Sequence, residues 1–179
     1  MLEKEIKLML SEDEYLKLCG EFDISKEIYQ VNHYYRSAEC AKRRISVRVR
    51  EVEGSRLLQV KLPVSTEGSL AVREERERVL DSVPEEISAD VLEEICGVRD
   101  TAVRIGSLAT VRKLCCSYEG VELALDRNVY LGITDHELEA EYTGPYPEQV
   151  IEKLRELGIN CDRPAVGKYA RFCAGLEEK

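Results

Sequence analysis

Alternation of apolar and charged residues is the feature that most limits how this chain can fold. In several segments apolar side chains occupy every second position, and charged or polar side chains fill the positions between them. A period of two residues predicts β-strands with one apolar face and one polar face. The segments with this pattern are residues 2–8, 30–35, 45–50, 58–62, 121–126 and 137–142. A further expected strand, residues 72–79, is charged at nearly every position.

Four helices are expected between and after these strands. Ser11 and Glu14 form a capping box at the start of the first helix, and each helix has one apolar stripe that should pack against the sheet. Residues 63–70, rich in Ser, Thr and Gly, are expected to form a loop. The expected helices are residues 11–20, 88–97, 147–158 and about 165–176.

The fold class predicted from these elements is α+β, mainly antiparallel β. About eight antiparallel strands can close into a barrel, because closure removes the unpaired edges of a sheet. The chain has 179 residues and a mass of 20.4 kDa, so we expect residues 1–179 to form a single domain.

Charge and cysteine content limit the partners and the compartment. Acidic residues outnumber basic residues by 35 to 26, and the resulting net charge of −9 disfavours nucleic acid and anionic membranes as partners. No apolar run approaches the roughly 20 residues that span a bilayer, and the N-terminal residues lack the apolar core of a secretory signal. The seven cysteines are odd in number and contain no CxxC pair, so we expect a reducing, cytoplasmic location without a zinc site.

The charged faces of the strands are sorted by sign. Acids gather in the first and last strands, at residues 3, 5, 135, 137, 139 and 141, whereas the middle strands carry bases. On a solvated face the two signs usually mix, because like charges on neighbouring strands repel. If the charged face lined a barrel, a polyanion could pair with the bases, and Mg²⁺ or Mn²⁺ could join its oxygens to the carboxylates. The pattern thus suggests a metal–polyphosphate site inside a closed barrel whose helices pack outside.

A series of charged motifs occurs in an order that resembles the CYTH superfamily, also called the triphosphate tunnel metalloenzymes. This group includes class IV adenylate cyclases and thiamine triphosphatases. The last motif is similar to a bacterial branch with a D-x-ELE-x-E ending. The motifs are residues 3–7 (EKEIK, an ExExK signature), 32–35 (NHYY), 46–50 (SVRVR), 58–62 (LQVKL), 73–77 (REERE), 125–132 (LDRNVYLG) and 135–141 (DHELEAE).

The resemblance implies an eight-stranded tunnel and a role for each matching residue. Asp126 would be a further acidic or structural residue of the tunnel, and a homodimer would be compatible with the family. Implied metal ligands are Glu3, Glu5, Glu75, Glu77, Glu137 and Glu139. Implied contacts to the triphosphate are Lys7, Arg48, Arg50, Lys61, Arg73, Arg112, Lys168 and Arg171. The residues implied in catalysis are Glu5, Lys7, Lys61 and Arg48. For Lys168 and Arg171, an ordinary interaction of cations with a helix C-terminus is the alternative.

The function implied by the resemblance is hydrolysis of a triphosphate with Mg²⁺ or Mn²⁺. Inorganic tripolyphosphate is the favoured substrate, since no motif marks a pocket for a base or a thiazole ring. Three alternatives remain open: a thiamine triphosphatase, a class IV adenylate cyclase that makes cyclic AMP from ATP, and a non-catalytic barrel that binds polyphosphate. Net charge does not exclude such a ligand, because a local cluster of bases can hold a short polyphosphate on an acidic protein.

Overall fold

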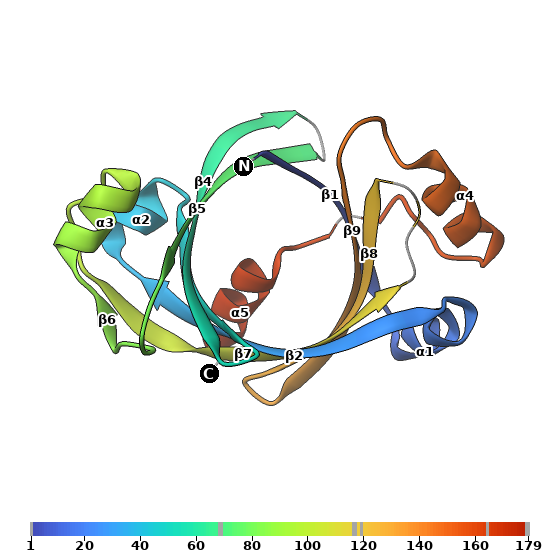
Figure 1. The fold of residues 1–179 in the computed structure, drawn as a ribbon, viewed down its shortest axis with the longest axis horizontal. Helices are drawn as coiled ribbons and strands as arrows, with labels where there is room; N and C mark the ends of the chain where they lie inside the picture. The colour runs from blue at the N-terminus through green and yellow to red at the C-terminus, as the bar shows by residue number, and fades with distance from the viewer. Residues whose placement is uncertain (1, 68–69, 116–117, 119, 164, 178–179) are drawn as a thin grey trace. The chain divides into compact units, whose positions relative to one another are not determined.

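The computed structural model describes residues 2–67, 70–115, 118, 120–163 and 165–177, and the side chains of all of these except residues 2, 3, 64–67 and 70–73. This part of the chain has an α+β fold in which nine strands form one mainly antiparallel sheet (Figure 1). The strands are β1 (Leu2–Leu10), β2 (Ile24–Arg36), β3 (Ser46–Val52), β4 (Ser55–Glu67), β5 (Leu70–Val79), β6 (Glu86–Ile87), β7 (Ala102–Cys115), β8 (Val121–Tyr130) and β9 (Ile133–Tyr142). The helices are α1 (Glu12–Glu21), α2 (Ala38–Lys42), α3 (Ala89–Cys96), α4 (Glu148–Glu156) and α5 (Lys168–Glu177).

The strands follow the order β2-β3-β4-β5-β1-β9-β8-β7-β6, and β2 also pairs with β7. The sheet therefore has one strand more than the eight expected, within the residues described. Two strands, β6 and β7, have no counterpart among the predicted segments, and the two-residue β6 is too short to produce an alternating pattern in the sequence. Closure of the sheet into a tunnel stays a prediction.

Two compact units divide the chain. Unit 1 consists of Met1–Glu3 and Tyr29–Ala109, and unit 2 consists of Lys4–Ile28 and Thr110–Lys179. Strand β1 takes part in both, since Glu3 pairs with Arg73 of β5 whereas Lys4 to Leu10 pair with β9.

The core of unit 1 lies between its strands and two helices. Val47 and Val49 of β3 and Leu58 and Val60 of β4 are buried against α2 and α3, where Leu92 contributes to the same cluster. Because side chains alternate along a strand, this packing directs Arg48, Gln59 and Lys61 to the opposite face. The apolar face thus fixes where the polar face of unit 1 lies.

The core of unit 2 lies on one face of β1, β8 and β9, and helices cover both faces. On the apolar face, α1 and α4 bury residues such as Leu8, Leu123 and Leu138. Helix α5 lies on the other face (Figure 1). There, Phe172 contacts Tyr130. The expectation that every helix packs on the apolar side is therefore wrong for α5, whose basic side chains contact the carboxylates described below.

Local signals in the sequence account for most of the helix boundaries. Both hydrogen bonds of the capping box between Ser11 and Glu14 are present. Helix α3 begins after its N-cap Ser88 and ends at Gly97, whose φ of +67° suits a residue without Cβ. The loop expected at residues 63–70 is wrong, because β4 continues to Glu67 and β5 begins at Leu70.

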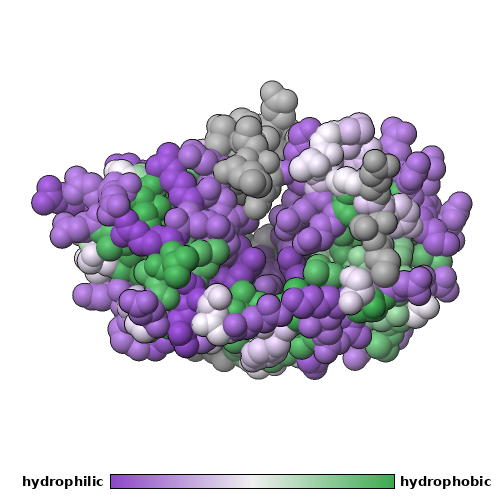
Figure 2. All heavy atoms as spheres, viewed as in Figure 1, coloured by the Kyte–Doolittle hydropathy of each residue, from purple (hydrophilic) through white to green (hydrophobic). Residues whose placement is uncertain are grey.

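Hydrophilic residues dominate the face in Figure 2, and hydrophobic atoms appear there in smaller, separate patches. The six cysteines in the described ranges carry free thiols. In the part of the chain that the structure describes, no helix has both the length and the apolar character that crossing a bilayer requires.

Candidate functional site

A cluster of buried charges lies on the polar face of unit 2. It includes Asp126 of β8 and Glu137 and Glu139 of β9, which are 0%, 0% and 6% exposed. The strand register explains why they meet: Asp126 pairs with Glu137, and Lys7 of β1 pairs with Glu139. Alternation along each strand then directs these four side chains to the same face, opposite the apolar core.

Two cations from the strands pair with these carboxylates. The Nζ atom of Lys7 lies 2.5 Å from Glu5 Oε1 and 2.8 Å from Glu139 Oε1. Arg112 of β7 donates from Nε and Nη2 to the two oxygens of Asp126, at 2.9 and 2.8 Å, and its Nη2 also contacts Glu139. Buried charges need partners of this kind, because an uncompensated buried charge is very unfavourable.

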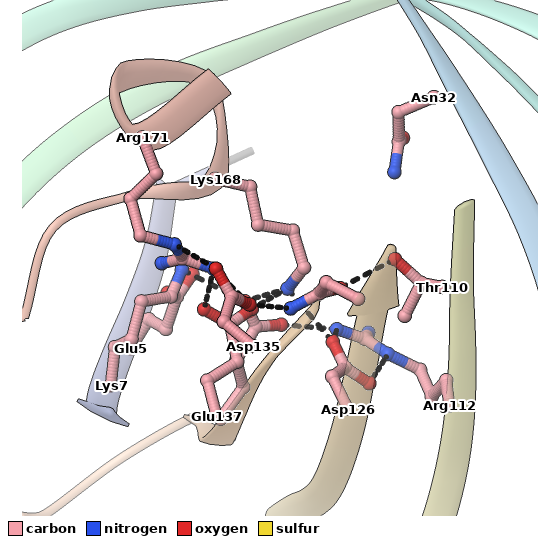
Figure 3. Close-up of polar contacts among 12 residues, drawn as sticks. Glu5, Lys7, Asn32, Thr110, Arg112, Asp126, Asp135, Glu137, Lys168 and Arg171 are labelled. Carbon is pink, nitrogen blue, oxygen red and sulfur yellow. Dashed lines mark hydrogen bonds and ion pairs between the residues drawn. The ribbon is translucent and has the colours of Figure 1, made fainter. Parts of the chain in front are cut away.

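Helix α5 supplies two further cations. Lys168 Nζ donates to Asp126 Oδ2 and Glu139 Oε1, both at 2.8 Å, and also contacts Glu137 (Figure 3). Arg171 binds Asp135 through Nε at 2.9 Å and Glu137 through Nη2 at 2.7 Å. Both residues lie in the first half of α5, so the alternative that they serve as cations at a helix C-terminus is wrong.

The cluster shifts the protonation equilibria of its members. Burial disfavours the charged form of Lys7, yet Glu139 and Glu5 outweigh this effect and raise the pKa of Lys7. Burial also disfavours the Glu139 carboxylate, but Lys7 and Arg112 hold the pKa of Glu139 well below its ordinary value. Lys7 and Glu139 therefore form an ion pair at neutral pH. For Lys168, burial together with repulsion from Lys7 and Arg112 lowers the pKa well below the usual lysine value, against the attraction of Asp126.

The three carboxylates of Asp126, Glu137 and Glu139 have the chemistry of a metal site. Each offers one oxygen, and these oxygens lie within 4.8 Å of one another. Hard divalent cations such as Mg²⁺ and Mn²⁺ prefer carboxylate oxygens, so the residues fit such an ion. We call this set the acidic trio. The amino group of Lys168 contacts the same three carboxylates, and in its protonated form it balances part of their charge.

Unit 1 carries a second polar face, which crosses four strands in register. Tyr34, Arg48, Gln59 and Glu77 follow one another across β2, β3, β4 and β5. Gln59 links the last three, since its Oε1 accepts from Arg48 Nε at 2.8 Å and its Nε2 donates to Glu77 Oε1 at 2.5 Å. These hydrogen bonds hold the guanidinium of Arg48 in a fixed position.

The neighbouring cross-strand pairs of unit 1 contain the other predicted bases. Lys61 lies opposite Glu75 and contacts its Oε2 at 2.9 Å, and Arg48 reaches the same carboxylate at 3.6 Å. Arg50 lies opposite Asn32 and donates from Nε to Asn32 Oδ1 at 3.2 Å. The polar face of unit 1 thus carries Arg48, Arg50 and Lys61.

The structure groups the predicted residues differently from the sequence pattern. Acids and bases were expected to form two separate groups, but Lys7 and Arg112 lie among the acids of unit 2. Acids and bases of different strands lie together in the structure, because side chains on adjacent strands are neighbours and opposite charges pair. Glu75 and Glu77 belong to unit 1, and the side chains of Glu3 and Arg73 lie outside those described.

Several polar residues of the site were not identified from the sequence. In unit 2, Thr110 donates to Asn128 at 2.7 Å, and Asn128 donates to Asp135 at 2.9 Å. Asp135 also accepts from the hydroxyl of Tyr130 at 2.8 Å. Gln59 has a similar linking role in unit 1. The only sequence signal that could have indicated these residues is their spacing: each lies an even number of positions from a charged site residue on its strand, and so on the same face.

Comparison with known proteins relates this site to a family. The sequence pattern of the CYTH domain matches residues 1–164. None of the curated proteins matches this chain.

Three solved structures have a similar fold. HpAC1 from Hippeastrum, an adenylyl cyclase candidate with a dominant triphosphatase activity, is 26% identical over 97% of this chain and 96% of its own, with a TM-score of 0.77. A candidate adenylate cyclase from Bacillus halodurans is also 26% identical, over 95% of this chain and 96% of its own, with a TM-score of 0.72. PH1819 from Pyrococcus horikoshii, 18% identical over 99% of both chains, has a TM-score of 0.67 and shares the fold. Because the CYTH pattern extends over nearly all of the residues, this chain belongs to the CYTH domain family.

Proposed function

We propose that this protein hydrolyses a triphosphate in a reaction that depends on Mg²⁺ or Mn²⁺, and that inorganic tripolyphosphate is its substrate. The acidic trio, buried among cations in unit 2, is the observation that carries the proposal. Membership of the CYTH family supports it, and so does the dominant triphosphatase activity of HpAC1.

The bases of unit 1 suit the recognition of phosphate oxygens. Arg48 and Lys61 are largely buried, with side chains 14% and 18% exposed, so their charges act in a medium that screens them weakly. Guanidinium groups form charge-assisted, often bidentate hydrogen bonds with phosphate. We therefore assign the binding of the triphosphate oxygens to Arg48, Arg50 and Lys61, while Glu75 orients the first and third of these.

Lys7 and Arg112 fit a role in stabilising negative charge. The raised pKa of Lys7 keeps its ammonium protonated at neutral pH, so it acts as a fixed positive charge rather than as a general base. Arg112, held by Asp126 and Glu139, is a second charge of this kind. Phosphoryl transfer depends mainly on positioning and on electrostatic stabilisation of the phosphate oxygens.

The acidic trio would hold the divalent ion. When bound, the ion would supply positive charge to phosphate oxygens and lower the pKa of a water molecule. Glu5 accepts from Lys7 and so helps to orient an ammonium that also contacts Glu139. Ligation by Glu3, Glu75 or Glu77, and closure of the sheet into a tunnel with a charged interior, remain parts of the proposal.

Phosphate release tests the function directly. Tripolyphosphate, thiamine triphosphate and ATP are each incubated with the protein and Mg²⁺ or Mn²⁺, and free phosphate and cyclic AMP are measured. We expect phosphate from tripolyphosphate, none in EDTA, and a loss of about 10²-fold or more in kcat for Glu137→Gln and Arg48→Gln, as for other groups that stabilise developing charge. Glu152→Gln, the same change on the exposed surface of α4, should keep full activity.

Each remaining outcome has a distinct meaning. Release of phosphate from thiamine triphosphate alone would show that the protein is a hydrolase with a different substrate from the one proposed. Cyclic AMP from ATP without release of phosphate would assign the chain as a cyclase. Tight binding of tripolyphosphate with no turnover over hours would leave a binding protein, and circular dichroism of each variant would exclude loss of the fold as the cause.

A further inference from the structure

Two buried side-chain amides of β2 have nitrogen atoms without a partner. Gln30 and Asn32, two residues apart and so on the same face of the strand, are 4% and 0% exposed. Gln30 Nε2 and Asn32 Nδ2 make no hydrogen bond within the described residues. A buried donor left unsatisfied costs about 1–3 kcal/mol, so each such group calls for an explanation.

Exchange of the oxygen and nitrogen of the amide does not remove the problem at Asn32. Asn32 Oδ1 accepts a hydrogen bond from Arg50 Nε at 3.2 Å. Guanidinium groups have no acceptor atom, so a flipped amide would direct two donors toward a donor. The contact with Arg50 therefore fixes Nδ2 as the donor without a partner, and Figure 3 shows this nitrogen directed away from β2.

The surroundings of Asn32 in unit 1 favour an anion as the missing partner. Arg50 lies opposite Asn32 on β3, and Arg48 is two residues farther on the same face. Glu77 Oε1 accepts a hydrogen bond from Gln59 Nε2 at 2.5 Å. A group that accepts from both a neutral amide and an adjacent guanidinium has the chemistry of a phosphate oxygen, which has several lone pairs.

We propose that Asn32 is a substrate-contacting residue, which donates from Nδ2 to a non-bridging phosphate oxygen beside Arg50. Gln30 is a second neutral donor on the same face. This inference rests on the proposed function, because it takes the triphosphate as the ligand. A neutral donor adds a hydrogen bond without adding charge. It therefore distinguishes between anionic ligands by the position of an oxygen atom rather than by their net charge alone.

Replacement of Asn32 by aspartate separates binding from stability. Asn32→Asp keeps the size of the side chain, removes the unsatisfied donor, and places a carboxylate against Arg50. The ligand-free variant should therefore unfold at the same urea concentration as the wild type or at a higher one. Its Kd for tripolyphosphate should rise by at least tenfold, and KM should rise more than kcat falls. A residue with only a structural role would not give these opposite effects on stability and affinity.

The measurements are calorimetric titrations with sodium tripolyphosphate, in EDTA and in Mg²⁺, together with urea unfolding. Asn160→Asp, the same change at an exposed position, serves as the matched control and should leave both quantities unchanged. Asn32→Ala, which lacks both the donor and the new charge, should raise Kd less than Asn32→Asp.

The outcomes distinguish this inference from the proposed function. If the wild type hydrolyses tripolyphosphate and Asn32→Asp binds it equally well, the inference is wrong and the function stands. If the wild type binds without turnover and Asn32→Asp binds more weakly, the function fails and the inference stands. A wild type that does not bind tripolyphosphate at all would overturn the inference.

Discussion

Lys168 shares all three of its carboxylate contacts with the proposed divalent ion. It is 7% exposed, and its ammonium touches Asp126, Glu137 and Glu139. Removal of one member of a buried ion cluster usually destabilises a protein by about 3–5 kcal/mol, because the remaining charges lose their counterion. A divalent cation is the other counterion that the acidic trio could take, so lysine and metal should compete for the same oxygens.

Substitution of Lys168 by methionine should make the stability depend on metal. In EDTA we expect Lys168→Met to unfold at a clearly lower temperature than the wild type, because the acidic trio has lost the amino group that contacts all three carboxylates. Mn²⁺ should reverse most of this loss, and calorimetric titration should detect tighter Mn²⁺ binding than in the wild type. Lys42→Met, at an exposed lysine paired with Glu39, is the control. Equal melting temperatures with and without Mn²⁺ would refute the competition.

The ion pair between Glu14 and Arg163 predicts a pH dependence. The hydrogen bonds from Arg163 lower the pKa of Glu14 below its usual value of 4.5. A depressed pKa in the folded state contributes stability above pH 4.5, and this contribution is lost as the pH falls through the folded pKa. Arg163→Gln should therefore destabilise by about 0.5–1 kcal/mol at pH 7, and the difference from wild type should shrink by pH 3.

Urea unfolding at the two pH values tests this expectation. Arg155→Gln is the matched control, since the Arg155–Asp162 pair is longer, at 3.9 Å, and both side chains are mostly exposed. A difference between Arg163→Gln and wild type that is as large at pH 3 as at pH 7 would show that lost packing, not charge, causes it.

At the scale of elements, α5 closely approaches the hairpin that joins β8 and β9. A Cβ atom at Gly175 would lie 3.2 Å from Leu131 Cδ1 and 3.4 Å from Ile133 Cδ1. The glycine thus allows the helix to come close enough for Lys168 and Arg171 to contact Asp126, Glu137 and Asp135. The absence of a side chain at Gly175 therefore helps to position Lys168 and Arg171 in the candidate site.

Gly175→Val should loosen α5, because overpacking of a filled contact costs about 1–3 kcal/mol. Hydrogen exchange of the amides of α5 should accelerate while the exchange of α1 stays unchanged. Gly175→Ala should be nearly neutral, since about 1 kcal/mol of helix propensity offsets a contact with flexible side-chain ends. Gly20→Val is the control, because nothing lies within 4 Å of a Cβ at that position of α1. Unchanged exchange in Gly175→Val would argue against close packing.

Elements with one apolar and one polar face were predictable, and elements without that contrast were not. Strands β1, β3, β8 and β9 follow the period-two pattern because each has a core on one side only. Strand β7 was not identified, since Gly106, Ser107 and Thr110 weaken its alternation. Helix α2 has five residues, too few to show a period of 3.6.

The candidate site was predictable only as a set of residue types. Alternation along β1 and β9 assigned Lys7 and Glu139 to the charged faces of their strands, whereas β7, the strand that carries Arg112, was not identified. The partners of each side chain depend on strand register, and the position of Lys168 depends on the path of α5. Neither is encoded locally, so the amide contacts of Asn32 and Gln59 could not be read from the sequence.

For the whole molecule, net charge and local charge predict different responses to two anions. The chain carries −9, whereas Arg48, Arg50 and Lys61 gather on one face of unit 1. An extended polyanion meets the overall negative charge, but a short one can bind within a local group of bases. Affinity for phosphate compounds should therefore depend on length.

Thermal unfolding with each anion measures this difference. Tripolyphosphate with Mg²⁺ at 100 times its Kd should stabilise the fold by about 2.7 kcal/mol, and the melting temperature should rise accordingly. Single-stranded DNA at the same phosphate concentration should leave the melting temperature unchanged. If DNA raised the melting temperature strongly and tripolyphosphate did not, the proposed role of the local group of bases would be wrong.

The pairing of β1 with β9 also has a consequence for biosynthesis. Lys4 pairs with Tyr142 and Leu10 with His136, so two strands far apart in the sequence must meet. Such a high contact order slows folding, because the loop between the strands must close before their contacts form. Translation releases β1 early and β9 late. We expect β8 and β9 to form their hairpin first, and pulsed hydrogen exchange should protect that hairpin before the amides of β1.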